Sequence, residues 1–445
     1  MKQVLLVLIG LAVASLAGAQ SSITKLTFEE AVAIGLQKNV ILNQQKNQLE
    51  ASQAQRLSAL GNYMPNLNIS GSTQTTKGQQ QTTNGGNLEN ITTDYVGAQL
   101  NAGLTLFNGF RNFNTLAQAN NQLMAQGFLI KRSAQDVVSI VATQYLQVLL
   151  DQELLRIAEE NVKTQNTVLE QIKGFFEVGT RAITDVYTQD ALAKTAKVLY
   201  IRAKNTLQND KSFLAQTLQL DPSQPFEVTH SALSEDLTKY KNVSLDSLIA
   251  IAVVNRSDLK QLDHLAKANK FAFKSSLSPA LPSLSLYGNY GSFYYSLLTS
   301  EFSTQVRTEN PSTSYGANLS IPIFSRFQTR TQRVTTKVLY DNSLLNYQNL
   351  EKTVKLDVQR AQNNFMNAFE NYDASLAQFQ AGELALSTQQ ESYLLGISPQ
   401  VALAQANQTY VLGAAAKVQA EVTLLFQKVL LEYALGTLQP EALNP

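Results

Sequence analysis

The chain has 445 residues, no cysteine, only 16% charged residues and a formal net charge of +1. The absence of cysteine excludes disulfides, thiolate metal sites and a lipidated amino terminus. A net charge this close to zero provides no basic footprint for nucleic acid. Uncharged polar residues, Ala and Leu fill the chain, which suits long helices that face water without pairing ions.

The first residues predict a signal peptide over residues 1–19. Lys2 supplies a positive start, Val4 to Ala17 form an apolar run too short to span a bilayer, and Gly18 and Ala19 add the small residues that signal peptidase needs. The alternative is an uncleaved anchor, but no hydrophobic extension or charge cluster follows the run. No later window holds about 20 apolar residues, so an integral protein would have to be a closed β-barrel.

An internal duplication organises the chain. Four landmark pairs are each separated by 217 positions: Pro65 and Pro282, Leu106 and Ile323, Gly179 and Gly396, Val186 and Leu403. We therefore predict repeat 1 over residues 20–220, a connector over 221–242, repeat 2 over 243–437 and a tail over 438–445. The period is too long for a solenoid repeat and indicates two copies of one half-subunit.

Each repeat is expected to run helix, strand, strand, helix, helix. Thr27 and Glu30 have the spacing of a capping box, and Ser244 is expected to cap the matching helix of repeat 2. No breaker interrupts these helices before Gly61 and Ser278. The two landmark prolines then end helix and begin strand, because proline cannot continue the amide ladder.

The predicted strands cover about residues 67–74 and 95–107 in repeat 1, and 284–294 and 315–324 in repeat 2. The second strand of each repeat alternates apolar and polar residues, which is typical of membrane barrel strands. A soluble antiparallel sheet with one solvated face is the alternative. The apolar residues, predicted to face lipid, are Val96, Ala98, Leu100, Ala102, Leu104, Leu106, Ala317, Leu319, Ile321 and Ile323.

Tyrosines near the strand ends favour the membrane interpretation, since barrels carry aromatic girdles at their interfaces. They are Tyr95, Tyr287, Tyr290, Tyr294, Tyr295 and Tyr315. Four strands cannot close a barrel, because about eight are needed. We therefore predict a mixed α/β membrane protein with two tandem helix-strand-strand-helix repeats. Its protomers would pool their strands, so that a trimer completes a 12-stranded outer-membrane β-barrel without an exposed edge.

Long helices are predicted at about 109–173 and 326–390, with return helices at about 182–219 and 399–436. Apolar residues in the first of them follow heptads broken by one stutter: Leu116, Leu123, Ile130 and Val137, then Val141, Val148, Leu155, Val162 and Leu169. A helix of that length reaches roughly 95 Å. Helices this long indicate a coiled-coil assembly around an axis and not a globular core.

Several weak motifs follow one another in a fixed order over the mature chain. They are Leu26-Thr27-Phe28-Glu29-Glu30-Ala31, Met64-Pro65-Asn66-Leu67, Leu106-Phe107-Asn108-Gly109-Phe110-Arg111 and Val178-Gly179-Thr180-Arg181-Ala182-Ile183-Thr184-Asp185-Val186. In this order they resemble the outer-membrane efflux protein family typified by TolC. The resemblance implies a homotrimer in the outer membrane of a Gram-negative (diderm) bacterium, with a helical tunnel in the periplasm. It also implies a periplasmic adaptor (membrane fusion) protein and an inner-membrane RND or ABC transporter as partners.

Two equivalent turns are predicted to meet the adaptor, because glycine lets another helix tip approach closely. They comprise Val178, Gly179 and Thr180 in repeat 1, and Leu395, Gly396 and Ile397 in repeat 2. The alternative is a purely structural role, since glycine commonly ends a helix.

The resemblance also implies a closed gate. In the family, a tyrosine of the second repeat contacts two residues of the first repeat, and Tyr393, Thr184 and Asp185 match these positions. A hydrogen bond from Tyr393 to Asp185 is therefore expected. The family's basic partner is replaced by Ser398, and Arg181 is expected to substitute for it. A plain solvated helix start is the other interpretation of Asp185. Two carboxylates of the family's acidic ring are also replaced, by Ala402 and Gln405, so weaker block by multivalent cations is expected.

No pattern predicts an enzyme, a metal site or a cofactor. His230 and His264 lack partners at metal-binding spacing and are interpreted as solvated. Aspartates and glutamates such as Asp151 have no nucleophile in a recognisable arrangement, and no glycine-rich phosphate loop follows a strand. The sequence thus predicts a passive channel. A non-channel periplasmic coiled-coil adaptor and a structural envelope protein are the alternatives, and the duplicated strand pairs argue against both.

Overall fold

The computed structural model describes residues 24–81, 88–221, 226–229 and 240–438. The predicted signal peptide, most of the connector, His230 and most of the tail lie outside these ranges. The chain divides into two compact units: unit 1 comprises residues 1–44, 130–257 and 351–445, and unit 2 comprises residues 45–129 and 258–350. Within the described ranges, no helix combines the length and apolarity needed to cross a membrane.

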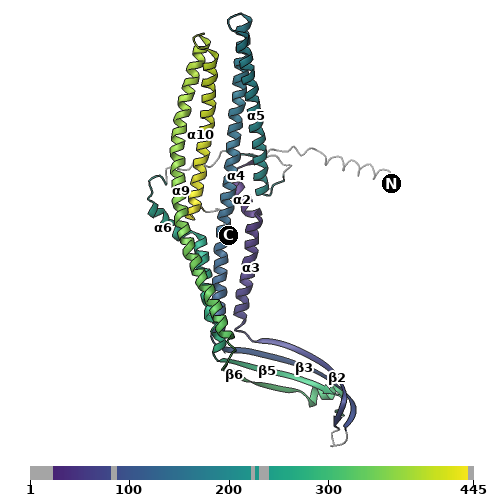
Figure 1. The fold of residues 1–445 in the computed structure, drawn as a ribbon. Coiled ribbons are helices and arrows are strands. Elements are labelled where there is room, and N and C mark those ends of the chain that lie inside the picture. The colour runs from purple at the N-terminus through teal and green to yellow at the C-terminus, as the bar shows by residue number, and fades with distance from the viewer. Residues whose placement is uncertain (1–23, 82–87, 222–225, 230–239, 439–445) are drawn as a thin grey trace, which may run out of the picture. The chain divides into compact units, whose positions relative to one another are not determined.

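Unit 2 contains an antiparallel four-stranded sheet with the order β2-β3-β5-β6 (Figure 1). Its strands are β2 (Asn66–Gln81), β3 (Leu88–Asn108), β5 (Ser283–Tyr295) and β6 (Ser312–Ser320). Strands β2 and β3 are longer than predicted. The prediction that the last strand reaches residue 324 is wrong, because β6 ends at Ser320 and Pro322 cannot donate to a strand ladder. Ile321 and Ile323 therefore lie beyond the strand.

The register places the apolar residues of neighbouring strands on one face of the sheet. Leu104 pairs with Leu286, which pairs with Ala317. Leu100 in β3 pairs with Ile69 of the edge strand β2. Residues directly opposite each other share a face, so the alternation predicted for β3 extends across the sheet. Its other face carries the polar partners, such as Asn101 with Asn289 and Asn68.

A bulge near the end of β3 changes one of the predicted positions. Pairing with β5 passes from Thr105 opposite Ser285 to Phe107 opposite Leu284. The extra residue in a bulge is left without a partner, and here that residue is Leu106. Leu106 therefore has no direct partner in β5, and Phe107 pairs with Leu284 of the apolar face instead.

The predicted aromatic girdle is wrong for half of its members. By parity and register, Tyr290, Tyr294 and Tyr315 lie on the apolar face, whereas Tyr95, Tyr287 and Tyr295 lie on the polar face. On the polar face, tyrosines cover glycines: a Cβ atom at Gly97 would lie 2.6 Å from the Tyr95 hydroxyl, and one at Gly316 would lie 2.7 Å from the Tyr287 hydroxyl. Tyr95 and Tyr287 therefore pack on glycines of the polar face.

Two aromatic turns connect the sheet to its long helices. Gly109 and Phe110 have φ values of 65° and 64°, and the matching Arg326 and Phe327 have 48° and 61°. Phe110 packs on Phe107 with ring centroids 5.2 Å apart, and Phe327 packs on Phe324 at 5.7 Å. These turns lead into α4 (Arg111–Glu177) and α9 (Gln328–Leu394), which are accompanied in this unit by α3 (Val40–Gly61) and α7 (Ser257–Ser275).

His264 in α7 is packed, so its interpretation as a solvated residue is wrong. Its ring stacks on Phe128 with centroids 5.5 Å apart, and its Nδ1 lies 3.1 Å from Asn121 Oδ1. Burial lowers the pKa of this imidazole. The histidine therefore serves helix packing in unit 2, where α7 meets α4.

Unit 1 holds the remaining parts of α4 and α9, the return helices and a short parallel pair of strands. They are β1 (Thr24–Leu26), α2 (Phe28–Lys38), α5 (Ile183–Thr217), β4 (Phe226–Val228), α6 (Leu245–Asn255) and α10 (Gln400–Leu435). Helices α4 and α9 are each 67 residues long, which corresponds to about 100 Å. The 217-residue spacing recurs in the observed helices. It separates both ends of α2 from those of α6, both ends of α4 from those of α9, and the start of α5 from that of α10.

The first helical segment is broken at Asn39, so the prediction that it runs without interruption to Gly61 is wrong. Helix α2 starts with the predicted capping box: Glu30 N donates to Thr27 Oγ1 at 3.2 Å and Thr27 N donates to Glu30 Oε2 at 2.9 Å. Asn39 then adopts an extended conformation, and its Oδ1 accepts from Leu42 N at 3.0 Å. Asparagine is a preferred N-cap, so the chain starts α3 as a new helix.

The core of unit 1 lies around Tyr145 of α4, whose side chain is completely buried. Its hydroxyl lies 2.7 Å from the Thr229 carbonyl oxygen and 3.0 Å from the Leu26 carbonyl oxygen. Phe28 packs edge-on against the ring. A buried hydroxyl needs such partners, and here they fasten α4 to the short strands β1 and β4.

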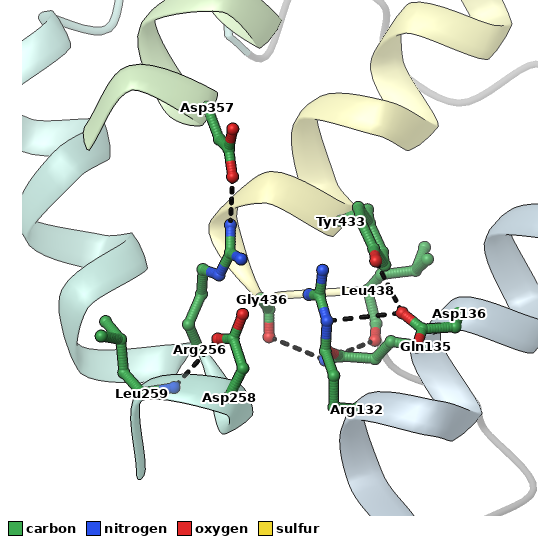
Figure 2. Close-up of polar contacts among 10 residues, drawn as sticks. All are labelled: Arg132, Gln135, Asp136, Arg256, Asp258, Leu259, Asp357, Tyr433, Gly436 and Leu438. Carbon is green, nitrogen blue, oxygen red and sulfur yellow. Dashed lines mark hydrogen bonds and ion pairs between the residues drawn. The ribbon is translucent and has the colours of Figure 1, made fainter. Parts of the chain in front are cut away.

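The carboxyl end of α10 is fastened to α4 by polar contacts (Figure 2). Gln135 Nε2 donates to the carbonyl oxygens of Gly436 and Leu438, both at 3.2 Å. The Tyr433 hydroxyl donates to Asp136 at 2.6 Å, and the Arg132 guanidinium lies 3.8 Å from the Tyr433 ring centroid. Burial raises the pKa of Tyr433 to about 12, so it remains a donor at physiological pH.

Candidate channel face, hairpin tips and gate

The sheet of unit 2 has one apolar face, one polar face and two open edges. On the apolar face Leu100 and Leu319 are exposed. The polar face contains a hollow of about 220 Å³, lined by residues such as Ser70, Gln99 and Asn289. Among the residues that the structure describes, strands β2 and β6 each pair on one side only. An open edge presents unpaired backbone donors and acceptors, so this sheet can be completed by further strands.

The two predicted tip turns have the same hydrogen bonds. After α4, Thr180 N donates to Phe175 O and Gly179 N donates to Phe176 O, both at 2.9 Å. After α9, Ile397 N donates to Ser392 O at 2.9 Å and Gly396 N donates to Tyr393 O at 3.1 Å. These pairs define Schellman motifs, which need a left-handed residue. Gly179 and Gly396 supply it with φ values of 79° and 77°.

Apolar side chains stand exposed around both tip glycines. Val178 is 72% exposed, Leu395 is 75% exposed and Ile397 is 76% exposed. A Cβ atom added at Gly179 or Gly396 would meet nothing within 4 Å. Both turns are therefore exposed, apolar and accessible to a partner protein. The left-handed conformation by itself also explains why glycine ends each helix.

The gate residues are arranged differently from the prediction. Tyr393 is only 2% exposed and packs against Ile172 of α4 and Leu403 of α10. Its hydroxyl has no hydrogen-bond partner in the part of the chain that the structure describes. The expected bond from Tyr393 to Asp185 is therefore not formed. Arg181 does reach the tyrosine, with its guanidinium carbon 4.7 Å from the ring centroid.

Burial of the Tyr393 hydroxyl is the main reason why its pKa is raised, while the Arg181 charge lowers it and the Asp185 charge raises it. Thr184 is exposed, and its carbonyl oxygen accepts from Thr188 Oγ1 at 2.8 Å. Ser398 hydrogen-bonds with the Gln389 side chain of its own hairpin. The structure thus brings Arg181 and Tyr393 together without Thr184 or Ser398.

A chain of amide side chains near the tips was not predicted. Gln400 Nε2 donates to Gln189 Oε1 at 3.1 Å, and Gln189 Nε2 donates to Gln165 Oε1 at 2.7 Å. Asn407 Nδ2 donates to Asn161 Oδ1 at 3.0 Å. These contacts join α10 to α5 and α4, the two helices of the other hairpin. The abundance of uncharged polar residues in the sequence was the only signal, and it does not distinguish a buried amide from a solvated one.

A buried carboxyl also lies between α4 and α5. Asp151 is only 3% exposed, and Gln147 Nε2 donates to its Oδ1 at 3.2 Å. Burial and the neighbouring Asp210 carboxyl raise the pKa of Asp151 to about 7. Oδ2 has no donor within the described ranges, and a proton shared with Asp210 would satisfy it. No cluster of three or more candidate metal ligands occurs in these ranges either.

Substitution of Asp151 by Asn should stabilise the protein at pH 8 and leave its stability at pH 4 unchanged. The native pKa is raised above the unfolded value, so wild-type stability falls as pH rises from about 4 to about 7. Asn mimics the protonated acid and removes a cost on the order of 2 to 4 kcal/mol. Thermal melts of the purified protein at both pH values measure the difference. Glu159→Gln on the surface of α4 is the control, and equal pH slopes for Asp151→Asn and wild type would contradict the assignment.

Comparisons with known proteins agree with this arrangement. Residues 34–218 match the family model described as outer membrane efflux protein. The outer membrane efflux protein BepC of Brucella suis biovar 1 is 23% identical over 354 residues, which cover 79% of this chain and 74% of BepC. TolC of Vibrio cholerae is 27% identical over 260 residues, which cover 56% of this chain and 54% of TolC.

The fold also matches solved outer-membrane channels. The outer membrane protein VceC from Vibrio cholerae superposes with a TM-score of 0.79 at 14% identity, over 92% of this chain and 96% of VceC. At that identity the likeness establishes the fold alone. Residues 34–218 therefore carry the match to the outer membrane efflux protein family. The chain is similar in sequence to outer-membrane efflux proteins and in fold to solved outer-membrane channels.

Proposed function

We propose that this protein is the outer-membrane channel of a tripartite efflux or type I secretion system. In this proposal three copies pool their four-stranded sheets into a 12-stranded barrel, and their two tandem repeats supply a periplasmic coiled-coil tunnel. The channel conducts passively and catalyses no reaction. A periplasmic adaptor protein meets the hairpin tips, and an inner-membrane RND or ABC transporter supplies the energy.

One observation supports this proposal most strongly: the sheet is apolar on one face, polar on the other and open at both edges. In lipid every backbone group has to be satisfied, so an open edge cannot remain there. Pairing β2 of one copy with β6 of the next closes the edges by rotation. A soluble adaptor or a structural envelope protein has no need for such a sheet.

Disulfide cross-linking between the two edge strands tests the trimer. The chain contains no cysteine, so introduced pairs have no background. Cysteines at Asn68, Ser70 or Ser72 of β2 would each be combined with one at Ser314 or Asn318 of β6. Because protomers meet through these edges, at least one combination should bring two Cα atoms to within about 7 Å. Non-reducing gels of oxidised membranes should then show bands of two and three protomers.

The matched control places the first cysteine at Asn101 in β3, which is flanked on both sides by strands of its own chain. Combined with Ser314 or Asn318, this position should give no bands between protomers. Monomers for every edge combination, or a ladder that continues beyond three, would contradict the trimer.

We also propose that the contact between Arg181 and Tyr393 holds the tunnel closed. It joins the tip of one hairpin to the long helix of the other, and a buried ring below a guanidinium is worth about 0.5 to 2 kcal/mol. Arg181→Ala combined with Tyr393→Ala should therefore raise the single-channel conductance in planar bilayers.

Tyr393→Phe is the informative control for the gate. It keeps the ring and removes only a hydroxyl without a partner in the described ranges, so its conductance should equal that of the wild type. Opening by Tyr393→Phe alone would show that the hydroxyl, and not the ring, closes the gate. An unchanged conductance in the double alanine variant would reject the gate.

A further inference from the structure

A strongly basic surface lies next to the apolar face of the sheet in unit 2. Three arginines follow β6, at Arg326 in the aromatic turn and at Arg330 and Arg333 in the first turns of α9. Three lysines occupy one face of α7 at the spacing i, i+3, i+7. They are Lys267, Lys270 and Lys274. All six side chains are exposed in the protomer. We call these six residues the basic collar.

The two helices that carry the collar lie side by side. The Arg333 guanidinium carbon is 5.9 Å from the ring centroid of Phe273, which belongs to α7. Lys270 and Lys274 lie three residues before and one residue after this phenylalanine. The arginines of α9 and the lysines of α7 therefore gather on neighbouring helices at the same level of unit 2.

Acidic side chains do not neutralise this surface. Lys267 pairs with Asp263 at 2.6 Å, but no ion pair to the other five cations occurs in the ranges that the structure describes. Farther along α9 the pattern changes, because Lys337 pairs with Asp341 at 2.8 Å and Lys355 pairs with Glu351 at 2.8 Å. Five cations without an ion pair in the described ranges thus lie where α7 ends and where α9 begins.

Exposed apolar side chains connect the collar to the apolar face of the sheet. Ile323 is 98% exposed, and Phe324 and Phe327 are exposed beside it. Phe327 is the last residue of the aromatic turn, and Arg330 lies in the first turn of α9 that follows it. Apolar residues followed by a row of cations match the order of acyl chains and headgroups at a membrane surface.

We infer that the basic collar binds the anionic headgroups of phospholipids in the periplasmic leaflet of the outer membrane. The inference rests on the proposed function, in which the apolar face meets lipid and the helices enter the periplasm. Guanidinium groups bind phosphate oxygens in a bidentate manner, and lysine adds a point charge. The aromatic turns would anchor the barrel at a fixed depth in the membrane, and the basic collar would bind the headgroups of the lipids around the barrel.

Native mass spectrometry of the purified protein with added phosphatidylglycerol or phosphatidylcholine tests this inference. Wild-type trimers should retain phosphatidylglycerol in preference to phosphatidylcholine, and added salt should reduce the difference. In the triple variant Arg326→Gln, Arg330→Gln, Arg333→Gln, the apparent affinity for phosphatidylglycerol should fall roughly fivefold for each cation removed. The control Lys337→Gln, Lys355→Gln removes two paired cations from the same helix and should bind as the wild type does.

Equal retention of the two lipids, or unchanged phosphatidylglycerol binding in the triple variant, would overturn the inference. A second measurement distinguishes a collar that lines the conduction path. In that case the triple variant would change the reversal potential in a salt gradient and leave lipid retention unchanged, which also overturns the inference. The same spectra report the oligomer: monomers alone would contradict the proposed trimer, whereas trimers without bound phosphatidylglycerol would reject only the collar.

Discussion

Arginine at Leu100 should prevent assembly in the outer membrane, at a cost of about 2 to 4 kcal/mol for each protomer. Leu100 lies in the middle of β3, where it pairs with Ile69 on one side and Tyr290 on the other. A charge at this position would face hydrocarbon in the proposed barrel. The fraction of folded protein in outer-membrane extracts, measured by heat-dependent mobility on gels, reports the effect. Leu319→Arg in β6 should have a similar effect.

Asn101→Arg is the matched control for Leu100→Arg, because it introduces the same side chain one residue away on the polar face. In the proposed barrel this face lines the lumen, where an arginine remains hydrated. Folded protein should therefore reach wild-type amounts. Equal tolerance of arginine at both positions would remove the basis for a lipid-facing sheet.

Arginine at both Gly179 and Gly396 should abolish export while the trimer still forms. These tip glycines are surrounded by exposed apolar side chains, and an adaptor docked on them would bury each new charge without a partner. Such a charge costs several kcal/mol, and each 1.4 kcal/mol weakens binding about tenfold. Export of a fluorescent efflux substrate from cells, with trimer content measured in parallel, tests the prediction.

Two controls separate contact from backbone conformation at the tips. Asparagine tolerates the left-handed region, so Gly179→Asn with Gly396→Asn should retain most of the export. Gly174→Arg places the same charge five residues earlier, within α4, where export should be normal. Wild-type export in the double arginine variant would mean that the adaptor binds elsewhere.

Much of the fold was predictable because its signals are periodic and occur twice. The alternation in β3 needs only neighbouring residues, and the 217-residue spacing located the matching elements of the second half. The ends of elements were harder to predict. Asn39 breaks the first helix through its own side-chain cap, and Pro322 follows the last residue pairs of β6. Both effects depend on a single residue, and the same residue type also occurs in other proteins without ending a helix or a strand.

The candidate site was less predictable, because it depends on contacts between distant segments. Asp185 was expected to accept from the Tyr393 hydroxyl and Arg181 to replace a basic residue of the family. The spacing of these residues in the sequence does not show that Arg181 stacks on the ring while the hydroxyl stays without a partner in the described ranges. The raised pKa of Asp151 arises from burial beside Asp210, which no local pattern reveals. The bulge, through which Phe107 and not Leu106 pairs with Leu284, likewise depends on the partner strand β5.

Planar-bilayer recording with the purified Arg181→Ala, Tyr393→Ala variant is the most direct test of the central claim that this protein is a channel. The variant lacks the proposed closing contact, so a closed resting state would not hide conduction. We predict discrete current steps of uniform size that appear only after the protein is added. A current that stays at the lipid baseline, although the protein is recovered from the membrane as a trimer, would contradict the claim.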